Sequence, residues 1–161
     1  MNDHCDESAA PFVGSIAFFR RYTDDVEEWL TFWDEERQHY RLIQAVRSEG
    51  ESFRTCLHAE IESITGLSRE RDYIISGMSA AHHQAPIVWP ETLESQWVIV
   101  QFFPVQVYGE NAWSIVGRLA GARWMTLSEI HAGQTADGKP FDPRQHHLIE
   151  RADIIPAHIK G

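Results

Sequence analysis

The segment that most constrains this chain is Gly50–Leu67, which reads GESFRTCLHAEIESITGL and predicts one helix between a loop and a stop. Ser52 is a residue type that caps helix N-termini, and Gly66 is the type that commonly ends a helix in a left-handed conformation. At about 100° per residue, one apolar stripe is predicted. Its members are Phe53, Cys56, Leu57, Ile61 and Ile64. The helix is therefore expected to pack against a core.

Glu60 falls inside this stripe, between Leu57 and Ile64. Burying a lone carboxylate is costly unless a polar partner or a metal ion receives it. Two interpretations are open on periodicity alone. Glu60 either belongs to a partly buried site with a polar partner, or lies at the edge of the stripe and reaches solvent or a basic side chain. We expect it to be at least partly buried, with a polar group as its nearest partner.

The same segment resembles the signature of Nudix hydrolases, G-x5-E-x7-R-E-U-x-E-E-x-G-U, in which U is a bulky apolar residue. Laid on without a gap, the signature runs from Ala45 to Leu67. The matching positions are Glu51, Glu60, Ile61, Gly66 and Leu67. The departing positions are Ala45 for glycine, Ala59 for arginine, and Ser63 and Ile64 for the paired glutamates. The resemblance is thus to a degenerate Nudix box.

In that family, the helix glutamates hold divalent metals, usually magnesium, that bind a substrate diphosphate. Residues at i, i+3 and i+4 share one helix face, and magnesium prefers oxygen ligands. Here that face offers Glu60, Ser63 and Ile64, so one carboxylate of three remains. The resemblance implies Glu60 as the catalytic residue and a metal ligand, Glu51 as a second metal ligand, and Mg²⁺ or Mn²⁺ as cofactor if the chain is active.

Other candidate residues stay open. Glu129 follows Arg123-Trp124, a segment that resembles a late Nudix motif, and an acid there also suits the first turn of a helix. The pair His82-His83 is a conceivable metal site, but adjacent residues of an extended chain point to opposite faces. Ala45 replaces a glycine that would let the backbone approach a phosphate, so we expect the loop after it to take another path. The sequence identifies no substrate-binding residue.

Composition and charge narrow the class of protein. The chain has 161 residues and a net charge of −10, with 43% hydrophobic residues. We expect a flexible tail over residues 1–10 and one domain over residues 11–161. No Lys/Arg run is present to neutralise nucleic-acid phosphates, and no apolar run approaches a membrane span. We therefore expect a cytoplasmic protein without nucleic-acid or membrane partners, and a homo-oligomer remains open.

Strand patterns precede and follow the box. The expected strands are Phe12–Tyr22, Val26–Asp34, His39–Val46, Arg71–Met78 and Gln96–Tyr108. The first two should form an antiparallel hairpin around the turn Thr23–Asp25, with a helix over Glu27–Arg37 as the alternative. Ser79–Pro90 and Gly109–Arg123 are expected to be connections. Thr126 or Ser128 should cap a short helix, and Asp142–Ala152 should be the last helix, with Asp142 as cap.

The expected fold class is α/β (α+β), a Nudix-type α/β/α sandwich with a mixed central sheet. The box helix should lie on one side of the sheet and the C-terminal helix on the other. Three functions remain open. The first is binding of a nucleotide or nucleoside-diphosphate derivative with weak or absent hydrolysis. The second is an active pyrophosphohydrolase with relocated carboxylate ligands. The third is an interaction domain, because Trp33, Trp89 and Trp113 are candidates for exposed aromatic residues.

Overall fold

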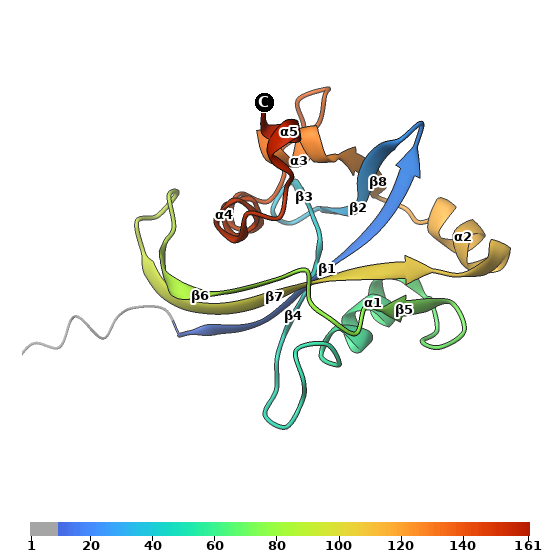
Figure 1. The fold of residues 1–161 in the computed structure, drawn as a ribbon, viewed down its shortest axis with the longest axis horizontal. Coiled ribbons are helices and arrows are strands. Elements are labelled where there is room, and N and C mark those ends of the chain that lie inside the picture. Colours follow the sequence, from blue (N-terminus) through green and yellow to red (C-terminus); the bar gives the residue numbers. More distant parts are fainter. Residues whose placement is uncertain (1–9) are drawn as a thin grey trace, which may run out of the picture.

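The computed structural model describes residues 10–161, so most of the expected N-terminal tail lies outside the described residues. Figure 1 shows the arrangement of the elements. The strands are β1 (Phe12–Thr23), β2 (Val26–Asp34), β3 (His39–Arg41), β4 (Ile43–Val46), β5 (Tyr73–Ile75), β6 (Ala81–Val88), β7 (Ser95–Val107) and β8 (Ala122–Thr126). The helices are α1 (Leu57–Thr65), α2 (Gly109–Gly117), α3 (Leu127–Ala132), α4 (Pro143–Ala152) and α5 (Ala157–Lys160).

The predicted hairpin of β1 and β2 is confirmed, and the alternative helix over Glu27–Arg37 is excluded. The two strands pair antiparallel from Arg20↔Trp29 to Thr23↔Val26. Asp24 and Asp25 connect them, and both have positive φ, at 50° and 66°. A two-residue turn with positive φ at both positions matches the twist of paired strands, and Asp tolerates this conformation.

The sheet is mixed, with β1 at its centre. β1 pairs parallel with β7 from Phe12↔Val98 to Phe19↔Val105. Its other edge pairs antiparallel with β4 and then with β2. β7 in turn pairs with β6 and β5, so the strands predicted for the hairpin and for Gln96–Tyr108 share one sheet system, as expected.

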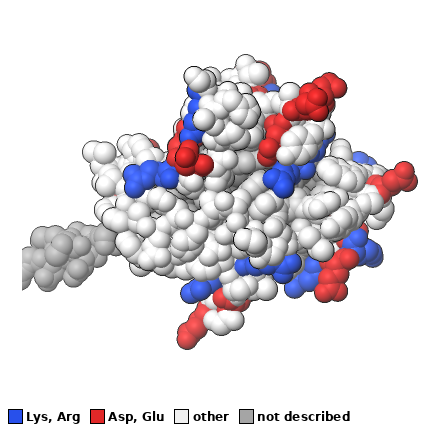
Figure 2. Space-filling view, viewed as in Figure 1, with Lys and Arg blue, Asp and Glu red and all other residues white. Residues whose placement is uncertain are grey.

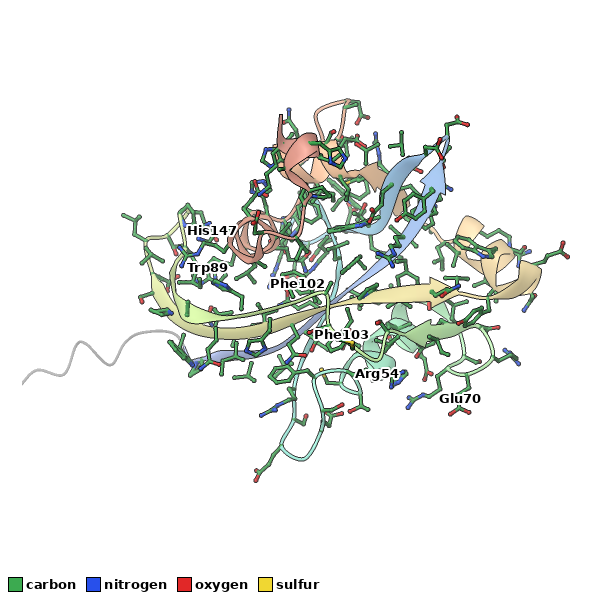
Figure 3. The ribbon with its side chains drawn as sticks, viewed as in Figure 1. Arg54, Glu70, Trp89, Phe102, Phe103 and His147 are labelled. Carbon is green, nitrogen blue, oxygen red and sulfur yellow. The ribbon has the colours of Figure 1, made fainter. Side chains whose placement is uncertain are left out.

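Side chains of β7 alternate between two core layers on opposite faces of the sheet. Figure 3 shows Phe102 and Phe103 pointing to opposite sides of the strand. Phe102 belongs to the layer completed by Leu148 and other residues of α4. Phe103 belongs to the layer completed by Leu57 and Ile61 of α1. The box helix and the C-terminal helix therefore cover opposite faces, and the predicted α/β/α sandwich with a mixed central sheet is confirmed.

The expected loop Ser79–Pro90 is wrong, because most of it forms strand β6. β6 pairs antiparallel with β7 from Ala81↔Phe102 to Val88↔Ser95. Its inward positions are Ala81, His83, Ala85 and Ile87, so only one large apolar residue marks the alternation and the sequence gives little hydrophobic signal. Pro86 is tolerated because β6 is an edge strand, where a missing N–H can face solvent.

The expected connection Gly109–Arg123 is also wrong in part, because it contains α2. Only Ala112 and Val116 of this helix are buried, one turn apart, and glycine stands at both ends. The expected strand His39–Val46 divides at Leu42 into β3 and β4, which pair with different strands. The expected exposure of Trp89 is wrong, since its side chain is buried and stacks edge-on with His147 of α4 (Figure 3).

The helix ends follow the capping chemistry expected from the sequence, except at the start of α1. Ser52 is not the N-cap of this helix, because α1 begins after Cys56, which makes no side-chain cap hydrogen bond. Ser52 Oγ instead accepts a hydrogen bond from the Thr55 N–H in the turn before the helix. Gly66 ends α1 at φ 76° and donates its N–H to the Glu62 carbonyl. Thr126 and Glu129 form a reciprocal capping box at α3. Asp142 accepts hydrogen bonds from the backbone of Arg144 and Gln145 at α4. None of the helices in the described part of the chain is long and apolar enough to span a membrane.

A polar network attaches the outer side of α1 to β5. Tyr73 donates its hydroxyl hydrogen bond to Glu62 (3.2 Å), and His58 Nδ1 lies 2.7 Å from the same hydroxyl. Arg69 makes two side-chain hydrogen bonds to Glu62, at 2.9 and 3.2 Å. These bonds hold the pKa of Glu62 at about 2, well below its ordinary value. Arg54 donates to the carbonyls of Ile75 and Ser76, so the loop before α1 is attached to the same strand end.

Gly14→Ala tests the close contact between β1 and β4 that positions the start of the box. A Cβ at Gly14 would lie 2.1 Å from the Ala45 carbonyl oxygen, and a backbone atom cannot move away freely. We expect the free energy of unfolding to fall by about 1–3 kcal/mol, as in overpacked cores. Urea denaturation measures it. The control is Gly77→Ala, where nothing lies within 4 Å of the added Cβ; equal stability losses in both variants would contradict the contact.

Stability at acid pH tests the α1–β5 network. Because the pKa of Glu62 is lowered from 4.5 to about 2, its stabilising effect is complete above its unfolded pKa and is lost as the pH falls toward 2. Between about pH 5 and about pH 3, the urea midpoint of the wild type should therefore fall more steeply than the urea midpoint of Glu62→Gln. This pH range lies roughly between the unfolded and the folded pKa of Glu62. Glu49→Gln, at an exposed residue, serves as control and should follow the wild type. Parallel profiles for wild type and Glu62→Gln would refute the coupling.

Candidate functional site

A cavity of about 380 Å³ lies where the hairpin, β4 and the box helix meet. It is lined by Phe32, Trp33 and Asp34 from β2, Arg41–Gln44 and Val46 from β3 and β4, Glu60 and Ile64 from α1, and Ala120. The elements that the sequence analysis connected to the box therefore converge on one hollow. Its volume lies within the range of small-molecule sites.

The structure places Glu60 on the exposed flank of α1, so the expectation of a partly buried Glu60 is wrong. The buried positions of the helix are Leu57, Ile61 and Thr65, spaced by four residues. The Thr65 hydroxyl donates a hydrogen bond to the Ile61 carbonyl (2.6 Å). Because this bond satisfies the hydroxyl, Thr65 can occupy the buried position that Ile64 was expected to fill. Glu60 and Ile64 are consequently neighbours on the flank that faces the cavity.

The wall beside Glu60 is apolar. Ile64 is 41% exposed and Val46 is 68% exposed, and both line the cavity. Ala45 continues β4, paired with Ser15 of β1, and is not among the residues with positive φ. The chain therefore remains extended up to Val46 at the point where the resemblance would place a glycine turn, as the departure at Ala45 predicted.

Trp33 forms the aromatic wall opposite α1. Its ring packs edge-on against Tyr40 at 4.9 Å, and its indole N–H donates to Glu35. A Cβ added to Gly121 would lie 3.6 Å from the Trp33 Cβ, so the backbone at Gly121 passes close to the base of this side chain. Lys139 Nζ lies 5.7 Å from the ring centroid and makes no ion pair within residues 10–161. From the sequence, Trp33 is expected only as an exposed aromatic residue, so its place in this wall is a finding of the structure.

The charged groups of the cavity are largely engaged with one another. Arg41 lies 3.7 Å from Asp34 and 3.8 Å from Asp142. The hydrogen bond from the Arg37 N–H, aided by the nearby Arg41 charge, lowers the pKa of Asp34. Asp34 therefore stays ionised and is held by protein groups. The sequence does not identify Asp34 and Arg41 as cavity residues. The only signal it offers is that they end strands β2 and β3.

The other predicted site residues lie outside this cavity. Glu51 accepts a hydrogen bond from the Ser48 N–H within the loop. Glu129 accepts from the backbone of Thr126 and Ala136, one bond to each carboxylate oxygen. His82 bonds Gln101 and packs against Phe53, whereas neighbouring His83 lies on the side of α4, near His147. The His82-His83 pair thus points to two faces of the sheet and cannot bind one ion together.

These residues do not fit the divalent metal that the fold family implies. Mg²⁺ requires near-octahedral oxygen coordination, usually from one or two carboxylates with phosphate and water. Of the cavity's two carboxylates, Asp34 is engaged by Arg37 and Arg41, and Glu60 has the apolar side chain of Ile64 beside it. Residues 10–161 contain no group of three or more His, Cys, Asp or Glu side chains placed to hold a metal ion.

Comparison with solved structures identifies the fold. A MutT/Nudix family protein from Listeria innocua is 13% identical, with 90% of this chain and 93% of that chain covered and a TM-score of 0.56. The NUDIX domain of Shewanella oneidensis NrtR, crystallised with ADP ribose, is 13% identical, with 94% and 92% covered and a TM-score of 0.53. A UDP-X diphosphatase is 13% identical, with 95% of this chain and 64% of that chain covered and a TM-score of 0.52.

No protein-family model matches this chain, and no curated protein matches it. The similarity to these solved structures, at 13% identity, lies in the architecture. The mixed sheet, the box helix on one face and the C-terminal helix on the other agree with the solved structures over nearly the whole described chain. The chain therefore has the Nudix fold.

Proposed function

We propose that this protein binds a nucleotide or nucleoside-diphosphate derivative in the cavity between Trp33 and α1, without a divalent metal and with little or no pyrophosphohydrolase activity. The proposal rests on the side chains that the flank of α1 presents to the cavity. Glu60 and Ile64 face a cavity that the exposed Val46 also lines, so apolar side chains lie beside the one carboxylate of the helix, where metal coordination needs oxygen atoms.

The apolar walls support binding of a planar group. Phe32, Trp33, Val46 and Ile64 expose apolar surface to one hollow. An aromatic ring packed against Trp33 gains burial and an aromatic contact worth about 0.5–1.5 kcal/mol beyond its area. A nucleobase is a flat aromatic ring system that can pack against such a wall.

The position of free cations supports an orientation for such a ligand. Glu60 repels an anion near α1, and Asp34 is already paired with Arg41, whereas Lys139 beside Trp33 has no ion-pair partner in the described chain. A phosphate group is therefore expected near Lys139 and away from Glu60. The solved NrtR domain with ADP ribose and the UDP-X diphosphatase support the ligand class, since both names refer to nucleoside-diphosphate chemistry on this fold.

Loss of hydrolysis follows from the same geometry. Metal-assisted attack on a diphosphate needs cations to bind its oxygens and to activate water. The helix face offers Glu60 with neutral Ser63 and apolar Ile64, and Ala59 stands at the arginine position of the box. Losing several members of one catalytic unit removes most of its rate enhancement, although the losses do not add.

Binding should be independent of magnesium. Calorimetric titration with ADP-ribose is expected to give dissociation constants that agree within about threefold in magnesium and in EDTA, a difference below about 0.7 kcal/mol. Trp33→Ala should weaken binding by about tenfold or more, since the aromatic wall is lost. Trp97→Ala, at a half-exposed tryptophan that lines neither this cavity nor the other cavities at the sheet, is the matched control. Binding that requires magnesium, or that survives Trp33→Ala unchanged, would overturn the proposal.

Hydrolysis should be absent or slow in the wild type. A panel of nucleoside-diphosphate derivatives assayed with Mg²⁺ or Mn²⁺ is expected to show turnover near background. The variant Ala59→Arg, Ser63→Glu, Ile64→Glu restores the box face and is expected to raise metal-dependent phosphate release above the wild type. Brisk wild-type turnover abolished by Glu60→Gln would instead establish the relocated-ligand enzyme.

A further inference from the structure

A second, larger cavity lies at the other end of the sheet, where β1 and β7 separate. Their parallel pairing ends at Phe19↔Val105. Beyond that point β1 pairs with β2 and β7 pairs with β5, so the two strands form a fork, visible in Figure 1 where β1 rises and β7 continues toward α2. The fork encloses about 550 Å³, and none of its lining residues lines the cavity at α1.

Three large side chains from three different elements face this fork cavity. They are Tyr22 of β1, Ile74 of β5 and Trp113 of α2, with exposed fractions of 63%, 44% and 38%. The Trp113 ring stacks on Trp124 at 6.1 Å, and the Arg21 guanidinium covers the Trp124 ring at 4.4 Å. This stack holds Trp113 in place, so the aromatic wall is formed before any ligand arrives.

The charge of the fork cavity contrasts with that of the protein. The chain carries 24 acidic against 14 basic residues, yet no Asp or Glu lines this cavity. Arg20 does line it, at the border with a smaller cavity that Glu27 and Asp153 line, and it makes no ion pair or side-chain hydrogen bond within residues 10–161. A guanidinium that is exposed to a hollow free of acids is a recognition group for carboxylate, sulfonate or phosphate oxygens.

The backbone adds a second polar feature. In a hairpin with a two-residue turn, the pair next to the turn exchanges hydrogen bonds and the following pair does not. Thr23↔Val26 is the pair next to the turn, so the N–H and C=O of Tyr22 point away from β2 and toward the fork. The register leaves Tyr22 without a strand partner on that side. Unpaired backbone groups beside a cation can bind the polar atoms of a ligand.

We propose that the fork cavity is a second ligand site, which binds a small organic anion with an aromatic body. The anionic group pairs with Arg20, and the ring packs between Tyr22 and Trp113 against Ile74. The site is independent of the proposed nucleotide site, because the two cavities share no residue and differ in charge. The volume fits a ligand of one to a few rings.

The probe for this site is 8-anilinonaphthalene-1-sulfonate, an aromatic sulfonate whose fluorescence rises on binding. The wild type is expected to bind it saturably, and Arg20→Ala should weaken binding by about tenfold. Arg20→Lys should retain part of the affinity because it keeps the charge. Arg37→Ala removes an exposed arginine elsewhere and should leave binding unchanged. Circular dichroism melting verifies that each variant is folded.

Two further measurements separate a built site from general hydrophobic adsorption. Naphthalene-1-sulfonate should displace the probe from the wild type much better than the uncharged naphthalene-1-sulfonamide, and Arg20→Ala should remove this preference. Tyr22→Ala and Trp113→Ala should each weaken binding of the probe, whereas Trp97→Ala, at a half-exposed tryptophan that lines neither cavity, should leave it unchanged. Equal displacement by both naphthalenes, or equal losses in Arg20→Ala and Arg37→Ala, would overturn the proposal. Sedimentation showing a dimer that Trp113→Ala dissociates would also overturn it, because a second copy would then fill the fork.

Discussion

The packing of three residues on one stripe of α1 decides the chemistry that this protein can perform. The buried residues of the helix are Leu57, Ile61 and Thr65. With these residues against the core, Glu60 and Ile64 face the cavity between the hairpin and α1. Thr65 can occupy the buried place because its hydroxyl bonds the carbonyl one turn earlier. The helix is then fixed by Arg54 on the strand end and by the Tyr73–Glu62 network on its outer side. A rigid helix with this orientation presents one carboxylate and one isoleucine to the cavity.

That orientation joins the fold to the proposed function. The Nudix fold supplies a hollow between the box helix and the hairpin, and this chain lines it with Trp33, Val46 and Ile64. Its acids are either engaged, as Asp34 is with Arg37 and Arg41, or isolated, as Glu60 is. Such a surface suits stacking and apolar contact better than metal coordination. The fork between β1 and β7 has the opposite character, since Arg20 stands there without any acid, so one sheet carries two hollows of different chemistry.

Local rules predicted much of this architecture, and tertiary packing decided the rest. The turn at Asp24-Asp25, the glycine stop at Gly66 and the Asp142 cap are local signals, and each was found as expected. β6 was not predicted because Ile87 is the one large apolar residue among its inward positions, and α2 was not predicted because glycine stands at both of its ends. The burial of Glu60 was predicted wrongly because periodicity counts threonine as polar, although an internal hydrogen bond lets Thr65 replace Ile64 in the core. Trp33, Asp34 and Arg41 come together only through the sheet, so no spacing in the sequence connects them with the box.

The most direct test of the account is to locate manganese in crystals of the wild-type protein. Mn²⁺ takes the oxygen ligands that magnesium prefers, and anomalous scattering identifies it independently of the refined structure. Crystals soaked in MnCl₂ together with ADP-ribose are expected to show the nucleotide against Trp33 and no anomalous peak beside Glu60. A fully occupied manganese ion bound by Glu60 and by the diphosphate would contradict the central claim that this Nudix fold has become a metal-independent binding site.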